Sequence, residues 1–285
     1  MIKQLKLLRR VYRNRREHKE YLDWFYNEKN MGIPFDRRKD EDYINWFLNC
    51  RPSLFQYQNI HKGQDCFIIG NGPSLNKTNL SLLNDFYVFG LNKIHLIFDK
   101  HPLDLTYHVA ANPLVIDQTK EELKNNIYNC PSFLSYEAST NIENNIKNVY
   151  KILTNAPWSF YKDITQPISE GYTVTYVAMQ IAFYMGFENV YLVGMDHNFK
   201  QSGKPNEEQH HKEEDVNHFH PDYFKGHQWH LADLEGNEAS YAMARHQFHA
   251  NGRNIYDATI DGKLTIFPKV NFDEALKLAK KKSAL

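Results

Sequence analysis

The sequence has few cysteines, no excess of charge of either sign and no long hydrophobic run. Cys50, Cys66 and Cys130 are far apart and odd in number, which argues against a disulfide framework and a metal site. Lys+Arg and Asp+Glu each total 34, so no overall field attracts nucleic acid. No apolar run approaches the ~20 residues of a membrane span, and the N-terminus lacks the apolar core of a signal peptide. These absences predict a cytoplasmic protein without a nucleic-acid partner.

The glycine-rich stretch "IIGNGPSL" lacks the residues of both standard phosphate-binding motifs. No Gly-Lys-Ser/Thr follows Gly70 and Gly72, and the third glycine position of G-x-G-x-x-G is Leu75. What is present is an apolar strand, a glycine turn and Pro73, which suits the first turn of a helix. Ser74 could cap that helix or donate to an anion, so the stretch predicts an anion at a helix N-terminus. Without a lysine to reach a β- or γ-phosphate, a nucleoside monophosphate is favoured.

From residue 58 onward, short apolar strands alternate with helices, and hydrophobic residues make up 42% of the 285. We expect strands over residues 65–70, 87–92, 104–112, 148–155 and 189–196, helices over 173–187 and 234–252, and closing apolar runs over 253–259 and 264–268. Several strands are apolar on both faces, as in a parallel sheet covered by helices. The pattern predicts an α/β, Rossmann-like domain over residues 58–285 with a mainly parallel central sheet.

Residues 1–57 predict a basic helical extension. Within residues 1–20 the basic side chains are Lys3, Lys6, Arg9, Arg10, Arg13, Arg15, Arg16 and Lys19, against Glu17 and Glu20. One interpretation is a helix that packs on the main domain or on a partner subunit of a homo-oligomer. The other is an arm that lies on anionic lipid, which would place the protein on the inner face of the cytoplasmic membrane.

An asparagine follows each of the first three predicted strands of the main domain. They are Asn71, Asn92 and Asn112. Each one alone is a cap or turn residue, but the carboxyl ends of parallel strands meet at one edge of a sheet. Amide groups there can read a base or ribose hydroxyls while backbone N–H groups hold phosphate. The three asparagines therefore predict a nucleotide site.

The start of the long apolar helix, and the strand after it, carry further polar residues. Those around the helix start are Ser169, Gly171, Thr173 and Thr175. They either cap the helix or place a second helix N-terminus against the same ligand, and both roles can hold at once. Gly194 and Asp196 stand at the end of the next strand. Asp196 could bind a ribose hydroxyl, a metal or an acceptor hydroxyl.

The segment 200–232 has weak periodicity and many His, Glu and Lys residues, which indicates a lid-like loop. Its histidines could bind a structural metal, but a general base is the better hypothesis, because neutral imidazole can accept a hydroxyl proton near pH 7. The densest stretch is "NHFHPDYF", where His218 and His220 are the candidate bases. Tyr223 could hydrogen-bond a leaving phosphate. We assign no metal ligand.

The run from "FIIGNGPSL" through "YLVGMD" resembles the MptE-like family, which includes archaeal hydroxymethylpterin diphosphokinases, flagellin glycosylation factors and bacterial glycan gene products. Over roughly residues 64–270 the motif order is also similar to bacterial CMP-sialic acid-dependent sialyltransferases. The resemblance implies a GT-A-variant fold, a loop histidine as base, and cytidine nucleotide binding by Gly70, Asn71, Gly72, Ser74, Asn92 and Asn112, supported by Thr173 or Thr175. The sequence departs at Asn198, where the sialyltransferases have a tyrosine for the leaving phosphate.

The resemblance and the motifs together favour a bacterial glycosyltransferase of lipopolysaccharide or capsule assembly. It would move an acidic sugar, sialic-acid-like or 3-deoxy-octulosonate, from a CMP-activated donor to a glycan or glycolipid acceptor without a metal cofactor. The alternative is a Mg²⁺-dependent ATP:hydroxymethylpterin diphosphokinase using Asp196, Glu170 and Asp222. A third possibility is a non-catalytic nucleotide-binding scaffold.

Overall fold

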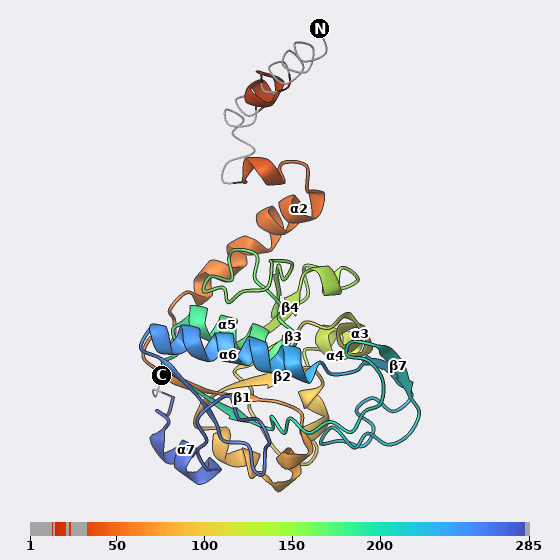
Figure 1. The fold of residues 1–285 in the computed structure, drawn as a ribbon, viewed down its shortest axis with the longest axis vertical. Coiled ribbons are helices and arrows are strands. Elements are labelled where there is room, and N and C mark those ends of the chain that lie inside the picture. The colour runs from red at the N-terminus through yellow and green to blue at the C-terminus, as the bar shows by residue number, and fades with distance from the viewer. Residues whose placement is uncertain (1–12, 14, 21–22, 24–32, 283–285) are drawn as a thin grey trace. The chain divides into compact units, whose positions relative to one another are not determined.

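The computed structural model describes residues 13, 15–20, 23 and 33–282 (Figure 1). The chain divides into two compact units, residues 1–49 and residues 50–285. The predicted boundary after residue 57 falls at the end of the 3₁₀ helix η3 (Arg51–Tyr57) and stays a prediction.

In the first unit, η2 (Phe35–Arg37) precedes helix α2 (Glu41–Asn49). Asp40 caps α2, because its side-chain Oδ1 accepts a hydrogen bond from the backbone N–H of Tyr43 at 3.0 Å. Most of the helix expected over residues 1–30, with its lipid-facing role, lies outside the described residues. Within the described residues, no helix combines the length and apolar character that a bilayer crossing requires.

The second unit is built on a seven-stranded parallel sheet, which confirms the predicted Rossmann-like fold class. Its strands are β1 (Asp65–Ile69), β2 (Tyr87–Leu91), β3 (Tyr107–Ala110), β4 (Ser132–Ser135), β5 (Val149–Ile152), β6 (Asn189–Val193) and β9 (Asn254–Asp257), in the order β5-β4-β3-β2-β1-β6-β9. All neighbouring pairs are parallel. The sequence analysis did not anticipate β4, a strand of only four residues.

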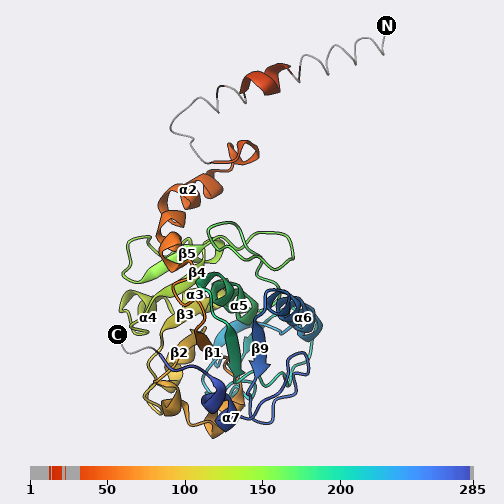
Figure 2. The same cartoon turned by 90° about the vertical axis from the view of Figure 1, so that its left-hand side faces the viewer.

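Helices cover both faces of the sheet (Figure 2). On one face lie α5 (Val174–Met185) and, beside it, α6 (Leu234–Ala250); on the other lie η4 (Pro73–Lys77), η5 (Leu80–Leu83), η6 (Ile94–Ile97) and α7 (Phe272–Leu278). The remaining short helices are α3 (Pro113–Gln118), α4 (Lys120–Lys124) and η7 (Glu137–Ser139). Every residue of β1 is buried, and so is α5 from Thr175 onward. This is why both read as continuous apolar runs in the sequence.

Two segments differ from the sequence-based expectation. The lid-like segment 200–232 contains an antiparallel pair, β7 (Glu208–His211) and β8 (His227–His230). These strands are short and half exposed. Their outward and inward positions are both largely polar, so the sequence shows no alternation of polar and apolar residues. The apolar run 264–268 forms no strand; instead the backbone N–H of Asp257 donates to the carbonyl of Pro268 at 2.9 Å, and α7 follows.

Candidate functional site

The loops after β1 and β6 meet where the strand order reverses. The chain steps from β1 outward to β5 and returns to β6 on the other side of β1, which is the point where open α/β sheets bind ligands. The N–H of Gly72 donates to the carbonyl of Gly194 at 2.9 Å. A Cβ on Gly72 would lie 1.8 Å from Oδ2 of Asp196, so only glycine fits there.

A cavity of about 130 Å³ opens at this point. The predicted residues that line it are Gly70, Asn71, Gly72, Asn92, Thr173, Thr175, Gly194, Asp196 and His218, drawn from five separate segments of the chain. Asn198, where the sequence departs from the sialyltransferases, also lines it, and so do residues that sequence reasoning missed, including Asn217, Asn237 and Tyr241. We call this the smaller cavity. Asn71, Asn92 and the helix start thus lie together, as the motif positions indicated.

Two of the asparagines that line the smaller cavity have a side-chain oxygen without a hydrogen-bond partner. The Asn71 side chain donates to the carbonyl of Leu91 at 3.1 Å, but its Oδ1 is buried without a partner. Oδ1 of Asn92 is likewise buried without a partner. A buried acceptor that makes no hydrogen bond costs about 1–3 kcal/mol. A ligand that brought an N–H or O–H donor to either oxygen would remove this cost.

Asn112 has a different role. Its Oδ1 accepts from the backbone N–H groups of Leu114 at 2.9 Å and Val115 at 3.3 Å, and so caps α3. Its Nδ2 lies 3.0 Å from Nδ1 of His230. Asn112 does not line the smaller cavity; it lines a second one beside it.

The start of η4 is already occupied by a carboxylate of the protein. Oδ1 of Asp196 accepts from the backbone N–H of Ser74 at 3.0 Å, and Oδ2 accepts from the Ser74 hydroxyl at 2.6 Å. Burial raises the pKa of Asp196, and these hydrogen bonds oppose the rise. Pro73 and Ser74 are not among the residues lining the cavity. Asp196 thus takes the place that the sequence pattern assigned to a ligand anion.

The start of α5 instead opens on the smaller cavity. Thr173 caps the helix, since its hydroxyl accepts from the backbone N–H of Thr175 at 3.3 Å. Behind it, the hydroxyl of Ser169 accepts from the N–H of Gly171, whose φ of +57° favours glycine. Ser169 does not line either cavity, and Gly171 lines the second one. An N-terminus of a 12-residue helix attracts anions.

In the lid, His218 is held from two sides. Its Nδ1 lies 2.8 Å from Oδ2 of Asp215, and its ring stacks on Tyr223 with centroids 4.1 Å apart. Burial would raise the pKa of Asp215, but hydrogen bonds from His218 and from the Asn217 backbone, with the charge of His218, lower it below the ordinary value. A carboxylate only accepts, so Nδ1 carries the proton and Nε2 is left for substrate. The Asp-x-x-His spacing could have revealed this pair.

The structure separates the two candidate bases. His218 lines both cavities, whereas His220 lines neither and has its Nδ1 3.2 Å from the backbone N–H of Asp222. Tyr223 is buried beneath His218, and its hydroxyl accepts from the backbone N–H of Lys93 at 3.2 Å. Tyr223 therefore supports His218, and the part predicted for it at a leaving phosphate stays a prediction.

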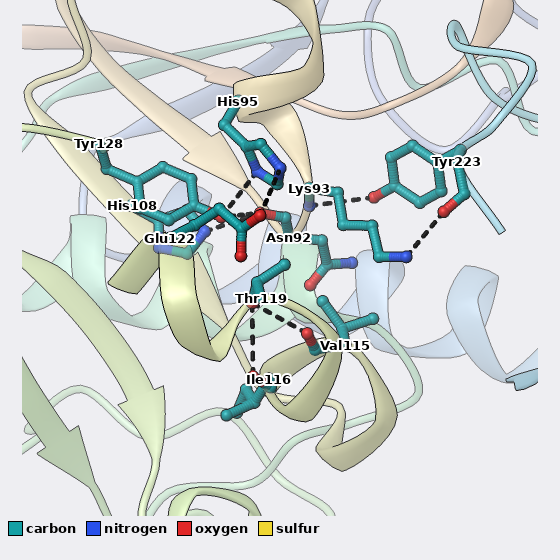
Figure 3. A network of polar contacts seen from close by, with 10 residues as sticks. All are labelled: Asn92, Lys93, His95, His108, Val115, Ile116, Thr119, Glu122, Tyr128 and Tyr223. Carbon is teal, nitrogen blue, oxygen red and sulfur yellow. Dashed lines mark hydrogen bonds and ion pairs between the residues drawn. The ribbon is translucent and has the colours of Figure 1, made fainter. Parts of the chain in front are cut away.

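Lys93, which the sequence analysis did not single out, attaches the lid to the end of β2 (Figure 3). Its Nζ donates to the carbonyl of Tyr223 at 2.7 Å and lies 4.8 Å from the ring centroid of Phe224. The lysine is 4% exposed, and burial lowers its pKa to about 8. Lys93 thus holds Tyr223 in place, and the ring of Tyr223 stacks on that of His218.

A buried polar network holds Asn92 from behind (Figure 3). Its carbonyl accepts from Nε2 of His108 at 2.8 Å and from the hydroxyl of Tyr128 at 3.2 Å. Nδ1 of His95 lies 2.9 Å from the same hydroxyl. Burial lowers the pKa of His108 to about 3, so the ring is neutral and serves only as a hydrogen-bonding group. The network fixes Asn92 at a φ of +50°, a conformation that asparagine tolerates.

The second cavity, which we call the larger cavity, has a volume of about 580 Å³. It shares Asn92, Thr173, Val174, Phe199, His218 and Asn237 with the smaller one, so the two adjoin. His218 stands at their boundary. Glu170 lines the larger cavity, and its Oε1 accepts from the hydroxyl of Thr154 at 2.6 Å. Burial raises the pKa of Glu170.

The carboxylates considered for a metal are dispersed. Asp196 is engaged by Ser74, Glu170 belongs to the larger cavity, and Asp222 is exposed and lines neither cavity. Over the described ranges, the side chains of His, Cys, Asp and Glu form no group of three or more that could hold a metal ion.

The fold and the site define an α/β protein with a ligand cavity at the switch point of its sheet. Residues 44–202, more than half of the chain, match the family described as 6-hydroxymethylpterin diphosphokinase MptE-like. The chain belongs to this MptE-like family, as the motifs indicated. It has no significant match among curated protein sequences.

Two solved structures are similar to this chain, to different degrees. The MAf glycosyltransferase from Magnetospirillum magneticum AMB-1 matches with a TM-score of 0.50 at 11% identity, over 89% of this chain and 44% of that one. The chain therefore spans less than half the length of that protein. The sialyltransferase CstII from Campylobacter jejuni, in complex with the substrate analogue cytidine-5'-monophosphate, matches with a TM-score of 0.44 at 17% identity, over 73% and 85% of the two chains.

Proposed function

We propose that this protein is a glycosyltransferase that uses a CMP-activated sugar, with His218 as the general base. The observation that carries the proposal is the Asp215–His218 pair, with 2.8 Å between Oδ2 and Nδ1, at the rim of a cavity with two unpaired amide oxygens. A carboxylate that holds one imidazole nitrogen leaves the other to accept a proton. The same cavity wall suits the amine of cytosine or the hydroxyls of ribose.

The reaction that fits is a displacement at the anomeric carbon. The acceptor hydroxyl would attack that carbon while Nε2 of His218 takes its proton. The bond between the sugar and the phosphate oxygen breaks, and CMP leaves with the electron pair. The N-terminus of α5, capped by Thr173, would face the phosphate charge. CMP is a good leaving group, so the proposal includes no metal cofactor.

The most specific part of the proposal is that the donor sugar is acidic. In the described part of the chain, no Lys or Arg lines the smaller cavity, and Asp196 is there already. A sugar carboxylate would therefore depend on the helix N-terminus and on His218. Donors with and without the carboxylate separate the two cases: CMP-N-acetylneuraminate, and a CMP-activated sugar reduced at that position.

The family description points to a second candidate, a diphosphokinase that moves pyrophosphate from ATP to a hydroxymethylpterin. Such a reaction needs Mg²⁺ bound by oxygen ligands. We favour the transferase because the three candidate carboxylates do not converge and no lysine reaches the smaller cavity from its described lining. The third candidate, a scaffold without activity, would bind the nucleotide and catalyse no reaction.

A thermal-shift screen tests these alternatives on the full chain. CMP, CDP, ATP and GTP are each added with Mg²⁺ or with EDTA. We expect CMP to stabilise the protein equally in both buffers. A Mg²⁺-dependent shift with ATP and no response to CMP would overturn the proposal. Release of CMP from CMP-N-acetylneuraminate then distinguishes an enzyme from a scaffold.

A further inference from the structure

We infer that the larger cavity is the acceptor subsite and that it takes a sugar carrying no negative charge; this rests on the proposed function. The cavity lies against the smaller one and shares His218 with it. The smaller cavity, at about 130 Å³, can enclose only part of a nucleotide. If the rest of the nucleotide lies outside the larger cavity, a hydroxyl that reaches Nε2 of His218 must come from the larger one. Its volume of about 580 Å³ lies within the ~300–1,000 Å³ typical of small-molecule sites.

The charge of the lining sets the class of acceptor. Of the described residues around the larger cavity, Glu170 is the carboxylate, His218 and His230 are the imidazoles, and neither Lys nor Arg is present. Placing a carboxylate or phosphate there would bring two anions together in a partly buried site that has no permanent cation in its described lining. A sugar with only hydroxyl, acetamido or amino groups meets no such cost, and Glu170 can accept its hydrogen bonds.

The larger cavity contains an exposed aromatic side chain, that of Tyr172. Tyr172 is 47% exposed, yet its ring lies against the start of α6, where a Cβ on Gly236 would come within 2.5 Å of it. Trp229 and Phe224 contribute further aromatic surface, with ring centroids 5.5 Å apart. The exposed ring of Tyr172 offers a flat apolar face, which matches the C–H face of a pyranose, whereas Trp229 and Phe224 are largely buried. An exposed aromatic ring beside polar amides suits a sugar better than an extended peptide.

Saturation-transfer NMR on the full chain tests the inference. The probes are methyl β-galactoside, methyl β-glucoside, methyl β-glucuronide and a serine-containing hexapeptide, each measured with CMP present. We expect signals from the two neutral glycosides and at least fivefold less from the glucuronide. Tyr172→Ala should remove the glycoside signals. Phe55→Ala is the matched control, because Phe55 is equally exposed and lines neither cavity. Glu170→Gln should raise the glucuronide signal.

The outcomes separate the inference from the proposed function. CMP binding is measured on the same variants by thermal shift. If CMP binds but the glucuronide or the peptide saturates as strongly as the neutral glycosides, the acceptor inference is overturned alone. The same conclusion follows if Tyr172→Ala keeps the full glycoside signal. If CMP fails to bind while the glycosides do, the larger cavity is a sugar site and the CMP-dependent transferase is overturned.

Discussion

The ring of His218 stacks on the ring of Tyr223, with centroids 4.1 Å apart and planes within 3° of each other. Tyr223 in turn receives hydrogen bonds from both the backbone N–H and the Nζ of Lys93. Lys93 directly follows Asn92, which lines both cavities. The turn after β2 therefore positions a wall of the proposed nucleotide site and the candidate base together.

The first prediction separates the two lid histidines. His218→Ala should lower the rate of CMP release from the donor by about 10²- to 10⁴-fold, as expected for loss of a general base. Asp215→Asn should also lower kcat, because an amide can hold the wrong tautomer of the imidazole. His220→Ala is the control, since His220 lines neither cavity, and it should stay near the wild-type rate. Equal losses in both histidine variants would contradict the assignment.

The second prediction concerns the amide of Asn92. Asn92→Gly keeps a residue that tolerates a φ of +50° and removes only the side chain. One lost hydrogen bond should weaken CMP binding about threefold to tenfold, with little change in Tm. The matched control is Asn129→Gly, where an exposed asparagine has a φ of +48°. Titration calorimetry with CMP measures both, and an unchanged affinity for Asn92→Gly would remove this residue from the site.

The third prediction concerns the contact between Gly72 and Asp196. In Gly72→Ala the new Cβ would overlap Oδ2 of Asp196, so the variant should lose about 1–3 kcal/mol in its free energy of unfolding. Asp196→Ala removes the overlapping atoms but leaves the carbonyl of Gly194 at 2.8 Å. The double variant should therefore recover part of the loss, and denaturant unfolding of the four proteins measures the coupling. Strict additivity would show that the two side chains do not meet.

The fourth prediction concerns Lys93. Lys93→Met removes the charge and leaves the carbonyl of Tyr223 without its partner, so His218 loses a firm platform and kcat should fall severalfold with little change in CMP affinity. Lys151→Met is the control, because Lys151 is also buried and donates to the carbonyl of Ser139, away from both cavities. Equal effects on kcat would argue against a specific role for Lys93.

Lys93 also implies a pH dependence of stability. Burial lowers its pKa to about 8 in the folded protein, while a lysine in the unfolded chain keeps a pKa of ~10.4. Between these values the unfolded chain binds more protons, so the free energy of unfolding of the wild type should rise with pH relative to Lys93→Met. Urea unfolding of both proteins at pH 7, 8, 9 and 10 measures the difference. If the stability of the wild type relative to Lys93→Met fell with rising pH, burial would not lower the pKa of this lysine.

Much of the fold followed from local pattern. The buried strands around Phe67 and Leu192 and the apolar helix from Thr175 are continuous hydrophobic runs, because both of their sides face the core. The four-residue strand β4 and the half-exposed pair in the lid were missed, since short or partly solvated strands carry little periodicity. The joint arrival of Asn71 and Asn92 at one cavity was predictable, because parallel strands present their carboxyl ends together.

The sequence by itself determined the sheet class, the glycine turn and the strand-end asparagines, all of which depend on residues close together in the chain. Only the tertiary structure decided what each polar group meets. It placed Asp196 on Ser74, made Asn112 a helix cap, chose His218 over His220 for the cavity, and buried Lys93 beneath the lid. Apart from the cap, which is local, these contacts join segments far apart in the chain, up to 130 positions for Lys93 and Tyr223, and no local propensity encodes them.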